Sequence, residues 1–423
     1  MPDKPHIVIV AKGSAAWLGG RQYTLNLLRA LIAYRAGLDS YDVSVLFRGR
    51  DEAVSYEPLR PALRVCAEIE TVLQDYTLAT RVRWKFKRTF QGWINPRLDE
   101  PLLRLGTTFA YPISSATVPS ADWIPDFQYL HYPDRTSAAD IAARKLEFSN
   151  VVRHARRIVL SSENAECDCH AVFPQSVGHT TVLRFRVFAE PEWLAADPIT
   201  TIRKYNLPGK FALVSNWFVP TKNHIFILDA LAAVREAERQ SMHVVFTGDI
   251  YDYRNPGFYN VFLNRIHTLG LQKQVSILGV IPKHDQIQLL RAATGYLQPS
   301  LFEGWNTGVE EAHLFGKRIL LSDIPVHREQ APARATYFDP RNAGDLAGKL
   351  MEIFSAANPA ENRAEIEQAS FAHYSTLQRE FARSFLDICG VHPPMLEPKP
   401  ITLSHNVQTA MRYLILGRCT NDA

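Results

Sequence analysis

Carboxylates along one glycine-rich stretch have the residue types and the spacing to bind a ligand that is rich in hydroxyls and phosphate. Glu303 stands just after a short apolar run, and Glu310 and Glu311 follow at the start of a predicted helix. Carboxylates accept hydrogen bonds from hydroxyl groups. The free N–H groups and the dipole at a helix start attract phosphate. The stretch therefore indicates a site that binds both kinds of group together.

The elements that position these carboxylates can be predicted from the apolar runs on either side. Residues 295–297 and 319–321 have the pattern of short buried strands of a parallel sheet. Between them the sequence predicts a loop and a short helix closed by Gly316, because glycine suits the left-handed position past a helix end. Ligands of open α/β sheets bind outside the carboxyl ends of the strands, so Glu303 is expected at the mouth of the site.

Glu310 and Glu311 are expected to have different roles. Thr307 is followed three residues later by Glu310, which is the spacing of a capping box. In that motif each side chain satisfies a backbone N–H group of the first helical turn. We therefore predict a structural role for Glu310. Glu311 and Glu303 are the carboxylates expected to bind the ligand.

The same stretch resembles a known family signature. Residues 299–312, P-S-L-F-E-G-W-N-T-G-V-E-E-A, resemble the signature of the retaining GT-B glycosyltransferases of family four, which use nucleotide-sugar donors. The continuation L-S-D-I-P-V-H-R-E-Q at 321–330 is similar to a branch rich in bacterial mannosyltransferases and polysaccharide-assembly enzymes. The resemblance implies an α/β chain of the GT-B type, with two Rossmann-like doubly wound domains facing a central cleft.

The resemblance also implies an activity and the roles of residues. It implies a hexosyltransferase that needs no metal and retains the anomeric configuration. The first expected donor is GDP-mannose, and UDP-sugars are the second. The acceptor is expected to be a glycan or a lipid-linked molecule. By resemblance, Glu303 orients the sugar ring and Glu311 binds the donor ribose. The other residues of this loop expected at the donor are Gly304, Trp305, Asn306, Thr307 and Gly308.

One cation is placed to meet the diphosphate. Lys222 follows a predicted strand at 211–215 and stands at the entrance to a predicted helix, where a positive charge is well placed for phosphate. It occupies the Lys position of the family's R-x4-K pair, whereas Trp217 occupies the Arg position. The chain has no Asp-x-Asp triplet for a divalent metal. Lys222, the backbone N–H groups of 304–309 and the helix dipole are therefore the expected donors to the departing nucleotide.

The first half of the chain opens like a doubly wound sheet. Residues 6–10 are predicted as a buried strand, 11–20 as a loop and 23–35 as a helix. The pair Gly19 and Gly20 in this loop resembles the family's turn that approaches the donor phosphates or the acceptor. An ordinary turn without a ligand is the alternative.

Further candidates lie in other loops. The run 122–133 sits where the family's first domain contributes to the cleft, and it contains Asp126 and His131 as catalytic candidates. A polar loop without chemistry is the other interpretation, because Pro125 stands where many members have a histidine. Two arginines near the end of a predicted strand at 180–187 are expected to face the cleft, and two loop residues of the second half resemble donor-binding positions. These residues are Arg184, Arg186, Gly248 and Val280.

The predicted domains divide the chain into three parts. Residues 1–195 form a Rossmann-like, acceptor-side domain, and residues 196–392 form a Rossmann-like domain that binds the nucleotide sugar. The tail 393–423, with a helix at 406–416, is expected to pack back on the first domain. No internal repeat is found.

A basic segment allows two interpretations. Residues 75–105 carry seven Lys and Arg against three Asp and Glu, a net charge of +4 that equals that of the whole chain. The aromatic residues interleaved with the cations at 81–93 are typical of contact with an anionic membrane surface. A solvated helix whose rings pack on the domain is the alternative.

The composition excludes several other classes of protein. Hydrophobic residues at 46% and charged residues at 21% are typical of a globular protein. The net charge of +4 is too small to indicate nucleic-acid binding. Five cysteines argue against a disulfide framework, and Cys167 to His170 lack a second ligand pair for zinc. With no signal peptide and no long apolar run, the expected location is the cytoplasm, at the inner face of the membrane if 81–93 binds lipid.

A second functional hypothesis remains open at this point. Trp217 and Pro125 each replace a polar group that is usual in the family. The alternative is therefore a catalytically impaired GT-B protein that binds a nucleotide sugar without transferring it.

Overall fold

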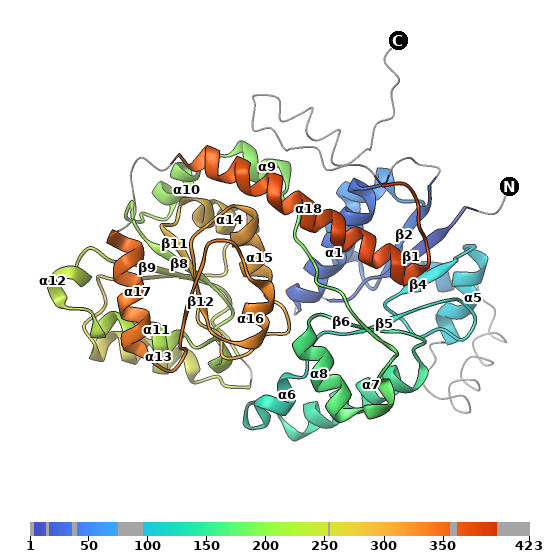
Figure 1. Ribbon diagram of the computed structural model, residues 1–423, viewed down its shortest axis with the longest axis horizontal. Helices are drawn as coiled ribbons and strands as arrows, with labels where there is room; N and C mark the ends of the chain where they lie inside the picture. The colour runs from blue at the N-terminus through green and yellow to red at the C-terminus, as the bar shows by residue number, and fades with distance from the viewer. Residues whose placement is uncertain are drawn as a thin grey trace, which may run out of the picture.

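The structure is a computed structural model that describes residues 4–13, 17–35, 40–74, 96–252, 254–355 and 362–395. The basic segment 81–93 and the predicted helix 406–416 lie outside these residues. Figure 1 shows two α/β domains side by side, with one long helix running across both. The expected architecture of two doubly wound domains is confirmed.

The N-terminal domain is built on parallel strands whose side chains are mostly apolar, as expected for strands covered by helices on both faces. One sheet has the order β3-β2-β1-β4 and the next has the order β5-β6-β7, and a parallel bridge between Ala110 and Ser120 links them. The strands are β1 (His6–Val10), β2 (Asp42–Phe47), β3 (Cys66–Glu68), β4 (Phe109–Tyr111), β5 (Asp122–Ile124), β6 (Ile158–Leu160) and β7 (Thr180–Val182). The helices are α1 (Leu18–Ala33), α2 (Arg50–Tyr56), η1 (Glu57–Ala62), α3 (Ile69–Gln74), α5 (Pro96–Arg104), α6 (Gln128–His131), η2 (Pro133–Arg135), α7 (Ala138–His154), α8 (Glu163–Val172) and η3 (Pro174–Ser176).

The C-terminal domain has a six-stranded parallel sheet in the order β10-β9-β8-β11-β12-β13. Its strands are β8 (Ala212–Ser215), β9 (Val244–Thr247), β10 (Val275–Gly279), β11 (Gly295–Gln298), β12 (Ile319–Ser322) and β13 (Ala335–Phe338). Its helices are η4 (Pro220–Lys222), α11 (His224–Ala233), α12 (Glu236–Arg239), α13 (Phe258–Thr268), α14 (Lys283–Ala292), α15 (Thr307–Leu314), α16 (Pro325–Gln330) and α17 (Ala343–Ser355). The strand order reverses between β8 and β11, and such a switch point is where doubly wound sheets bind ligands.

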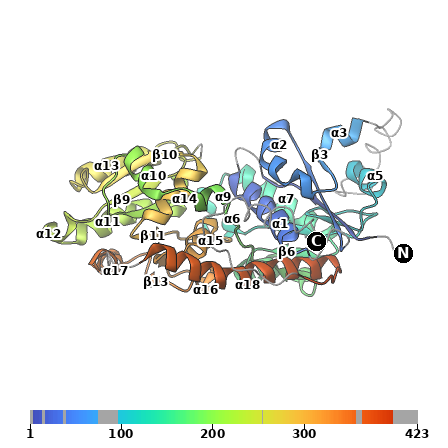
Figure 2. The same ribbon diagram turned by 90° about the horizontal axis from the view of Figure 1, so that it is seen from above.

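The two domains are joined at the linker and again by the long helix α18 (Arg363–Cys389). The linker forms α9 (Pro191–Ala195) and α10 (Pro198–Lys204). Figure 2 shows α18 running along one face of both domains, and it packs against α15 of the C-terminal domain and α1 of the N-terminal domain. Tyr34, which follows α1, donates a hydrogen bond to the Ser375 carbonyl at 2.8 Å. The crossing back to the first domain is therefore made by α18, while the residue limits of the domains stay a prediction.

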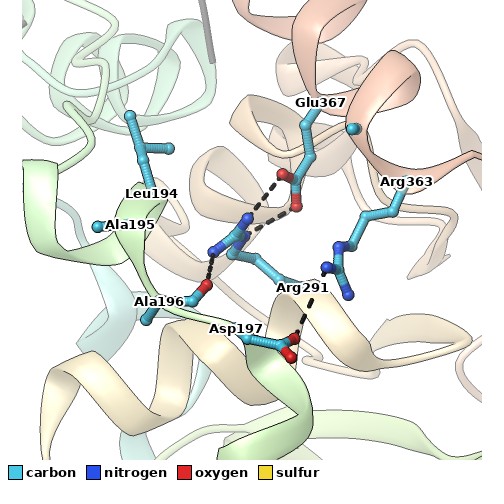
Figure 3. Close-up of a pocket in the computed structure, with 8 residues that line it drawn as sticks. Leu194, Ala195, Ala196, Asp197, Arg291, Arg363 and Glu367 are labelled. Atoms are coloured by element: carbon cyan, nitrogen blue, oxygen red, sulfur yellow. Dashed lines mark hydrogen bonds and ion pairs between the residues drawn. The ribbon is translucent and has the colours of Figure 1, made fainter. Parts of the chain in front are cut away.

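A buried ion pair anchors α18 to the C-terminal domain near the linker (Figure 3). Nε of Arg291 on α14 lies 2.8 Å from Oε1 of Glu367, and both side chains are almost fully buried. Nη1 of Arg291 also donates to the Ala196 carbonyl at 3.0 Å. One guanidinium therefore ties α14, α18 and the linker together.

Two predicted element limits need correction. Helix α1 begins at Leu18 instead of residue 23, so Gly19 and Gly20 lie in its first turn and not in the preceding loop. The run 122–133 is not all loop, because it contains β5 and the short helix α6. No helix within the described ranges combines the length and the apolar character needed to cross a bilayer.

Candidate active site

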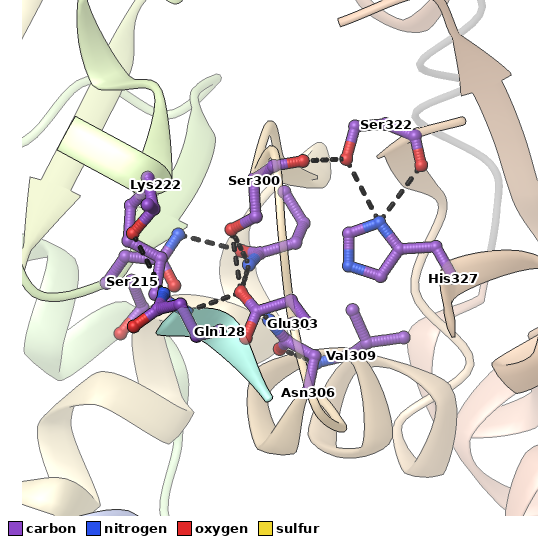
Figure 4. A network of polar contacts seen from close by, with 12 residues as sticks. Gln128, Ser215, Lys222, Ser300, Glu303, Asn306, Val309, Ser322 and His327 are labelled. Carbon is purple, nitrogen blue, oxygen red and sulfur yellow. Dashed lines mark hydrogen bonds and ion pairs between the residues drawn. The ribbon is translucent and has the colours of Figure 1, made fainter. Parts of the chain in front are cut away.

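Lys222 and Glu303 meet at the switch point of the C-terminal sheet. Lys222 ends η4, which follows β8, and Glu303 lies in the loop that follows β11. The Leu301 N–H donates to the Thr221 carbonyl at 2.9 Å, which holds the two loops together. Lys222 Nζ forms an ion pair with Glu303 Oε1 (Figure 4). The predicted carboxylate and the predicted cation are therefore direct partners.

The Glu303 carboxylate is held so that one oxygen is saturated with donors. Besides Lys222, Oε1 accepts hydrogen bonds from Ser300 Oγ at 2.7 Å, Asn306 Nδ2 at 2.9 Å and Gln298 Nε2 at 3.0 Å. No donor to Oε2 is found among the described residues. Burial raises the pKa of Glu303, but the charge of Lys222, the neighbouring His327 and the hydrogen bonds from Lys222 and Ser300 together outweigh burial, so the pKa lies below its ordinary value. Glu303 is therefore a fixed carboxylate with one oxygen open to accept a hydroxyl proton.

A neutral histidine lies behind this carboxylate. Nδ1 of His327 donates to the Ser322 carbonyl at 2.9 Å, and Ser322 Oγ donates to the Ser300 carbonyl at 2.6 Å. Burial lowers the pKa of His327 to about 4. The His327 ring is therefore uncharged at neutral pH, and its contacts join β12 to the loop that carries Ser300 and Glu303.

The Glu311 carboxylate binds the side chains of two residues of α14. Lys283 Nζ lies 2.5 Å from Glu311 Oε1, and Gln286 Nε2 donates to Glu311 Oε2 at 3.2 Å. Val280, in the loop before α14, is 72% exposed. The role of Glu311 at the donor ribose stays a prediction, and a ribose there would share the carboxylate with Lys283.

The predicted capping role of Glu310 is wrong. The N-cap of α15 is Asn306, whose Oδ1 accepts the Val309 N–H at 2.9 Å, and Thr307 is the first helical residue. Asparagine caps helices at least as well as threonine does. Glu310 is instead 1% exposed and accepts two hydrogen bonds from Arg186 Nη1, at 2.9 and 3.0 Å. It also accepts from Tyr374 Oη at 2.5 Å and Gln330 Nε2 at 2.9 Å.

Backbone N–H groups at the start of α15 are only partly free for an anion. The Val309 N–H is used by the Asn306 cap, and the Asn306 N–H donates to Gln330 Oε1 at 3.3 Å. The first N–H groups of a helix have no partner within the helix. Thr307 and Gly308 therefore supply the N–H groups of this turn that can meet a phosphate.

The N-terminal domain approaches this loop at Gly304. A Cβ atom on Gly304 would lie 2.7 Å from both the Pro125 carbonyl oxygen and Asp126 Cβ. Only a glycine allows this contact without displacing one of the loops. Asp126 Oδ1 accepts the Gln128 N–H at 2.9 Å. Asp126 is therefore brought beside the Glu303 loop, and its catalytic role stays a prediction.

Replacing Gly304 with alanine is expected to slow any reaction that needs both domains. The added methyl group forces the Asp126 and Glu303 loops apart, and displacements of about 1 Å in an active site cost up to about 10²-fold in rate. Initial rates of the sugar transfer that the sequence predicts, measured for Gly304→Ala, would give the size of the effect. Gly257→Ala is the matched control, because nothing lies within 4 Å of a Cβ at that position. Equal rates for the two variants would show that the domain contact does not support catalysis.

The remaining predicted residues have mainly structural contacts. His131 binds Asp168 through Nε2 at 2.8 Å, and its ring lies 5.0 Å from the Phe302 ring. Trp305 donates through Nε1 to the Phe185 carbonyl at 3.1 Å. Gly248 has φ +134°, and a Cβ there would lie 1.9 Å from the Asn216 carbonyl oxygen. Gly248 thus lets β9 pack against the loop after β8.

Arg184 and Arg186, which are predicted to face the cleft, each form ion pairs with glutamates. Arg186 holds Glu310, and its guanidinium lies 5.7 Å from the Trp305 ring. Arg184 pairs with Glu163 and, at 2.7 Å, with Glu329 of α16. Both therefore join the end of the N-terminal domain to the C-terminal domain.

Two cations near the predicted site are absent from the sequence-based predictions. Lys283 stands at the start of a helix after β10, which is a signal of the same kind as the one that indicates Lys222. Arg254 lies over the Trp217 ring, with 4.9 Å from its Cζ to the ring centroid, and Trp217 Nε1 donates to the Tyr251 carbonyl at 2.8 Å. A cation thus stands beside the tryptophan that replaces an arginine, and no local pattern indicates that contact.

Solved structures of other proteins share this two-domain architecture. Sucrose-phosphate synthase from Thermosynechococcus elongatus has a TM-score of 0.63 at 15% identity, over 92% of this chain and 100% of that chain. HepE of Anabaena, solved with UDP and glucose, has a TM-score of 0.62 at 14% identity, over 91% of this chain and 99% of that chain. The fold is that of the GT-B glycosyltransferases.

The sequence match is confined to part of the chain. Residues 200–371 match the family model of the Glycosyl transferases group 1. The capsular polysaccharide biosynthesis glycosyltransferase CapH of Staphylococcus aureus is 26% identical over 184 residues, which are 43% of this chain and 50% of CapH. The match therefore spans half the length of that relative. Lys222, Glu303 and Glu311 all lie within the residues that match this family model.

Proposed function

We propose that this protein is a retaining glycosyltransferase that moves a hexose from a nucleotide-diphosphate sugar to a glycan or lipid-linked acceptor in polysaccharide assembly. The observation that carries the proposal is the Lys222–Glu303 pair at the switch point, with Glu303 Oε2 open. The match of 200–371 to the group 1 family and the likeness to CapH support it. GDP-mannose is the first donor to test, and the UDP bound in HepE makes UDP-sugars the second.

The chemistry follows from the charges at the switch point of the C-terminal sheet. The bond between the anomeric carbon and the donor phosphate breaks, the acceptor oxygen bonds to the same carbon, and the departing phosphate takes the acceptor proton. Attack from the face of the leaving group retains the configuration. Lys222, the N–H groups of Thr307 and Gly308 and the dipole of α15 stabilise the charge that develops on the diphosphate. No step requires a metal ion.

The substrate must displace the contacts that the cleft residues make with one another. Lys222 pairs with Glu303, and Lys283 pairs with Glu311, so each predicted binding carboxylate already has a cation. When a diphosphate binds, Lys222 can turn toward it while Ser300 and Asn306 continue to hold Glu303. Glu303 Oε2 then accepts a hydroxyl of the sugar ring.

Binding of a nucleoside diphosphate is expected to raise the thermal midpoint of the protein. A ligand that binds only the native state at 100 times its Kd stabilises it by about 2.7 kcal/mol. A thermal-shift panel with GDP, UDP and ADP would identify the nucleotide, and Lys222→Met should reduce the shift. Absence of a shift with every nucleotide would contradict the proposed function.

A nucleotide-sugar-binding protein without transferase activity is the second candidate. It is favoured by Trp217, whose indole fills the position of an arginine and is itself covered by Arg254. Incubation of the purified protein with GDP-mannose or UDP-glucose and measurement of the released nucleotide separate the candidates. Binding without turnover would select the second. The contact of 81–93 with an anionic membrane also remains a proposal.

A further inference from the structure

Gln128 reaches from the N-terminal domain to the turn that carries Lys222. It is the first residue of α6, and its Nε2 donates a hydrogen bond to Thr221 Oγ1 at 3.4 Å (Figure 4). Thr221 directly precedes Lys222, whose Nζ forms the ion pair with Glu303. An uncharged polar side chain of one domain therefore lies beside the predicted cation and carboxylate of the other.

Packing on both sides fixes the position of this glutamine. Its neighbours in the chain, Phe127 and Tyr129, are at most 3% exposed and belong to the core of the N-terminal domain. On the other side, Tyr132 Oη donates to the Leu301 carbonyl at 3.3 Å. The short helix is thus anchored in one domain and rests on the loop after β11 of the other, so the glutamine is held at their junction.

Most of the hydrogen-bonding capacity of the Gln128 amide is unused. Its Oε1 accepts no hydrogen bond from the described residues, and it is accessible to solvent. Its Nε2 carries two hydrogen atoms, and the long bond to Thr221 uses only one of them. The amide can therefore bind a polar ligand as a donor and as an acceptor at the same time.

A sugar requires a group of this kind at this place. Sugar hydroxyls both donate and accept hydrogen bonds, whereas the ionised carboxylates of Glu303 and Asp126 only accept them. Asp126 lies beside the Glu303 loop, with its Cβ 2.7 Å from a Cβ placed on Gly304. The Gln128 amide supplies an N–H donor for a hydroxyl oxygen. Because it is uncharged, it adds no repulsion to the two carboxylates.

We propose that Gln128 binds the sugar of the nucleotide-sugar donor and does not contribute to binding of the nucleotide. The inference rests on the proposed transferase function and adds the residue with which the N-terminal domain recognises the sugar. Glu303 Oε2 and the Gln128 amide bind different hydroxyl groups of the same sugar ring. The N-terminal domain thereby distinguishes the complete donor from the nucleoside diphosphate that remains after transfer.

Paired affinities for a nucleotide and its sugar test the proposal. GDP is compared with GDP-mannose, and UDP with UDP-glucose, by titration calorimetry without an acceptor. Gln128→Met keeps the length of the side chain but removes both polar atoms. Its Kd for the sugar nucleotide is expected to rise about tenfold, as for the loss of one hydrogen-bonding group, while its Kd for the nucleoside diphosphate changes less than about twofold. Equal losses for both ligands overturn the proposal.

Two further variants separate sugar binding from a structural role. Thr221→Val removes the partner of the amide but leaves the amide in place, so the ratio of the two Kd values is expected to stay within about twofold of the wild-type ratio. Gln175→Met, at an exposed glutamine of η3 in the same domain, is the matched control. If Thr221→Val changes the ratio as much as Gln128→Met does, the glutamine only ties the domains together and the proposal fails.

A second truncation guards against a folding defect. Gln128→Ala also removes both polar atoms, and it is expected to show the same selective loss of the sugar nucleotide. Unchanged binding of GDP or UDP by either variant reports that the C-terminal domain is folded.

The same measurements separate this inference from the proposed function. If the wild type binds no nucleoside diphosphate, the proposed function itself fails. If the wild type binds a nucleotide and its sugar, and both Gln128 variants keep wild-type affinity for the two ligands, only the inference fails.

Discussion

Glu303→Gln is expected to reduce kcat/KM for sugar transfer by about 10²-fold or more, while the thermal midpoint stays close to that of the wild type. The reason is that Oε2 is the open oxygen of a carboxylate whose other oxygen is saturated. The amide keeps the shape but loses the negative charge, and removal of one preorganised electrostatic contact costs a few kcal/mol in the transition state. Initial rates with the donor identified by the thermal-shift panel give the measurement.

The control for this prediction is Glu352→Gln, at an exposed position of α17 far from the cleft. Its rate is expected to match that of the wild type. Lys222→Met should show a loss comparable to that of Glu303→Gln, because it removes the cation beside the diphosphate. Full activity in either Glu303→Gln or Lys222→Met would contradict the site assignment.

Arg186→Met is expected to destabilise the protein by about 3–5 kcal/mol, because it leaves the Glu310 carboxylate buried without its cation. Glu310 is 1% exposed, and the Tyr374 and Gln330 hydrogen bonds cannot replace a full positive charge. The pair joins the chain after β7 to α15 and, through Tyr374, to α18. Thermal midpoints and denaturant titrations of the variant would measure the loss.

A double-mutant cycle distinguishes the ion pair from a general packing effect. Arg186→Met combined with Glu310→Gln removes both charges, so the double variant is expected to be more stable than the sum of the single losses predicts. Arg235→Met is the matched control, since it breaks an exposed pair with Glu238 and such pairs contribute little to stability. Strictly additive losses for Arg186 and Glu310 would show that they do not stabilise the domain junction as a pair.

The predictions that the structure supports most directly rest on strand ends. Lys222 and Glu303 each come after a short apolar run, and the loops that leave neighbouring parallel strands emerge at the same edge of the sheet. An apolar run can be recognised locally, so their proximity could be expected without knowing a single side-chain contact. The strand order itself, with β8 beside β11, places both residues at the switch point.

The wrong predictions rest on local patterns that distant residues override. Thr307 and Glu310 have the spacing of a capping box, but the helix is capped by Asn306. Glu310 instead binds Arg186, which is 124 residues away in the chain. Gly19 and Gly20 are typical of a loop, yet they lie in α1, where Gly20 packs against the Trp17 ring. Neither outcome is encoded in the spacing alone.

The alternation of strands and helices and the residue types at the carboxyl edge of the second sheet could be predicted from the order of the amino acids. Those properties depend on apolar periodicity and on glycine positions, which act over a few residues. The cation that each carboxylate binds depends on the three-dimensional arrangement of the chain: Lys222 for Glu303, Arg186 for Glu310 and Lys283 for Glu311. The physical reason is that a buried charge must be paired wherever the fold leaves it, and its partner is chosen by proximity in space and not along the chain.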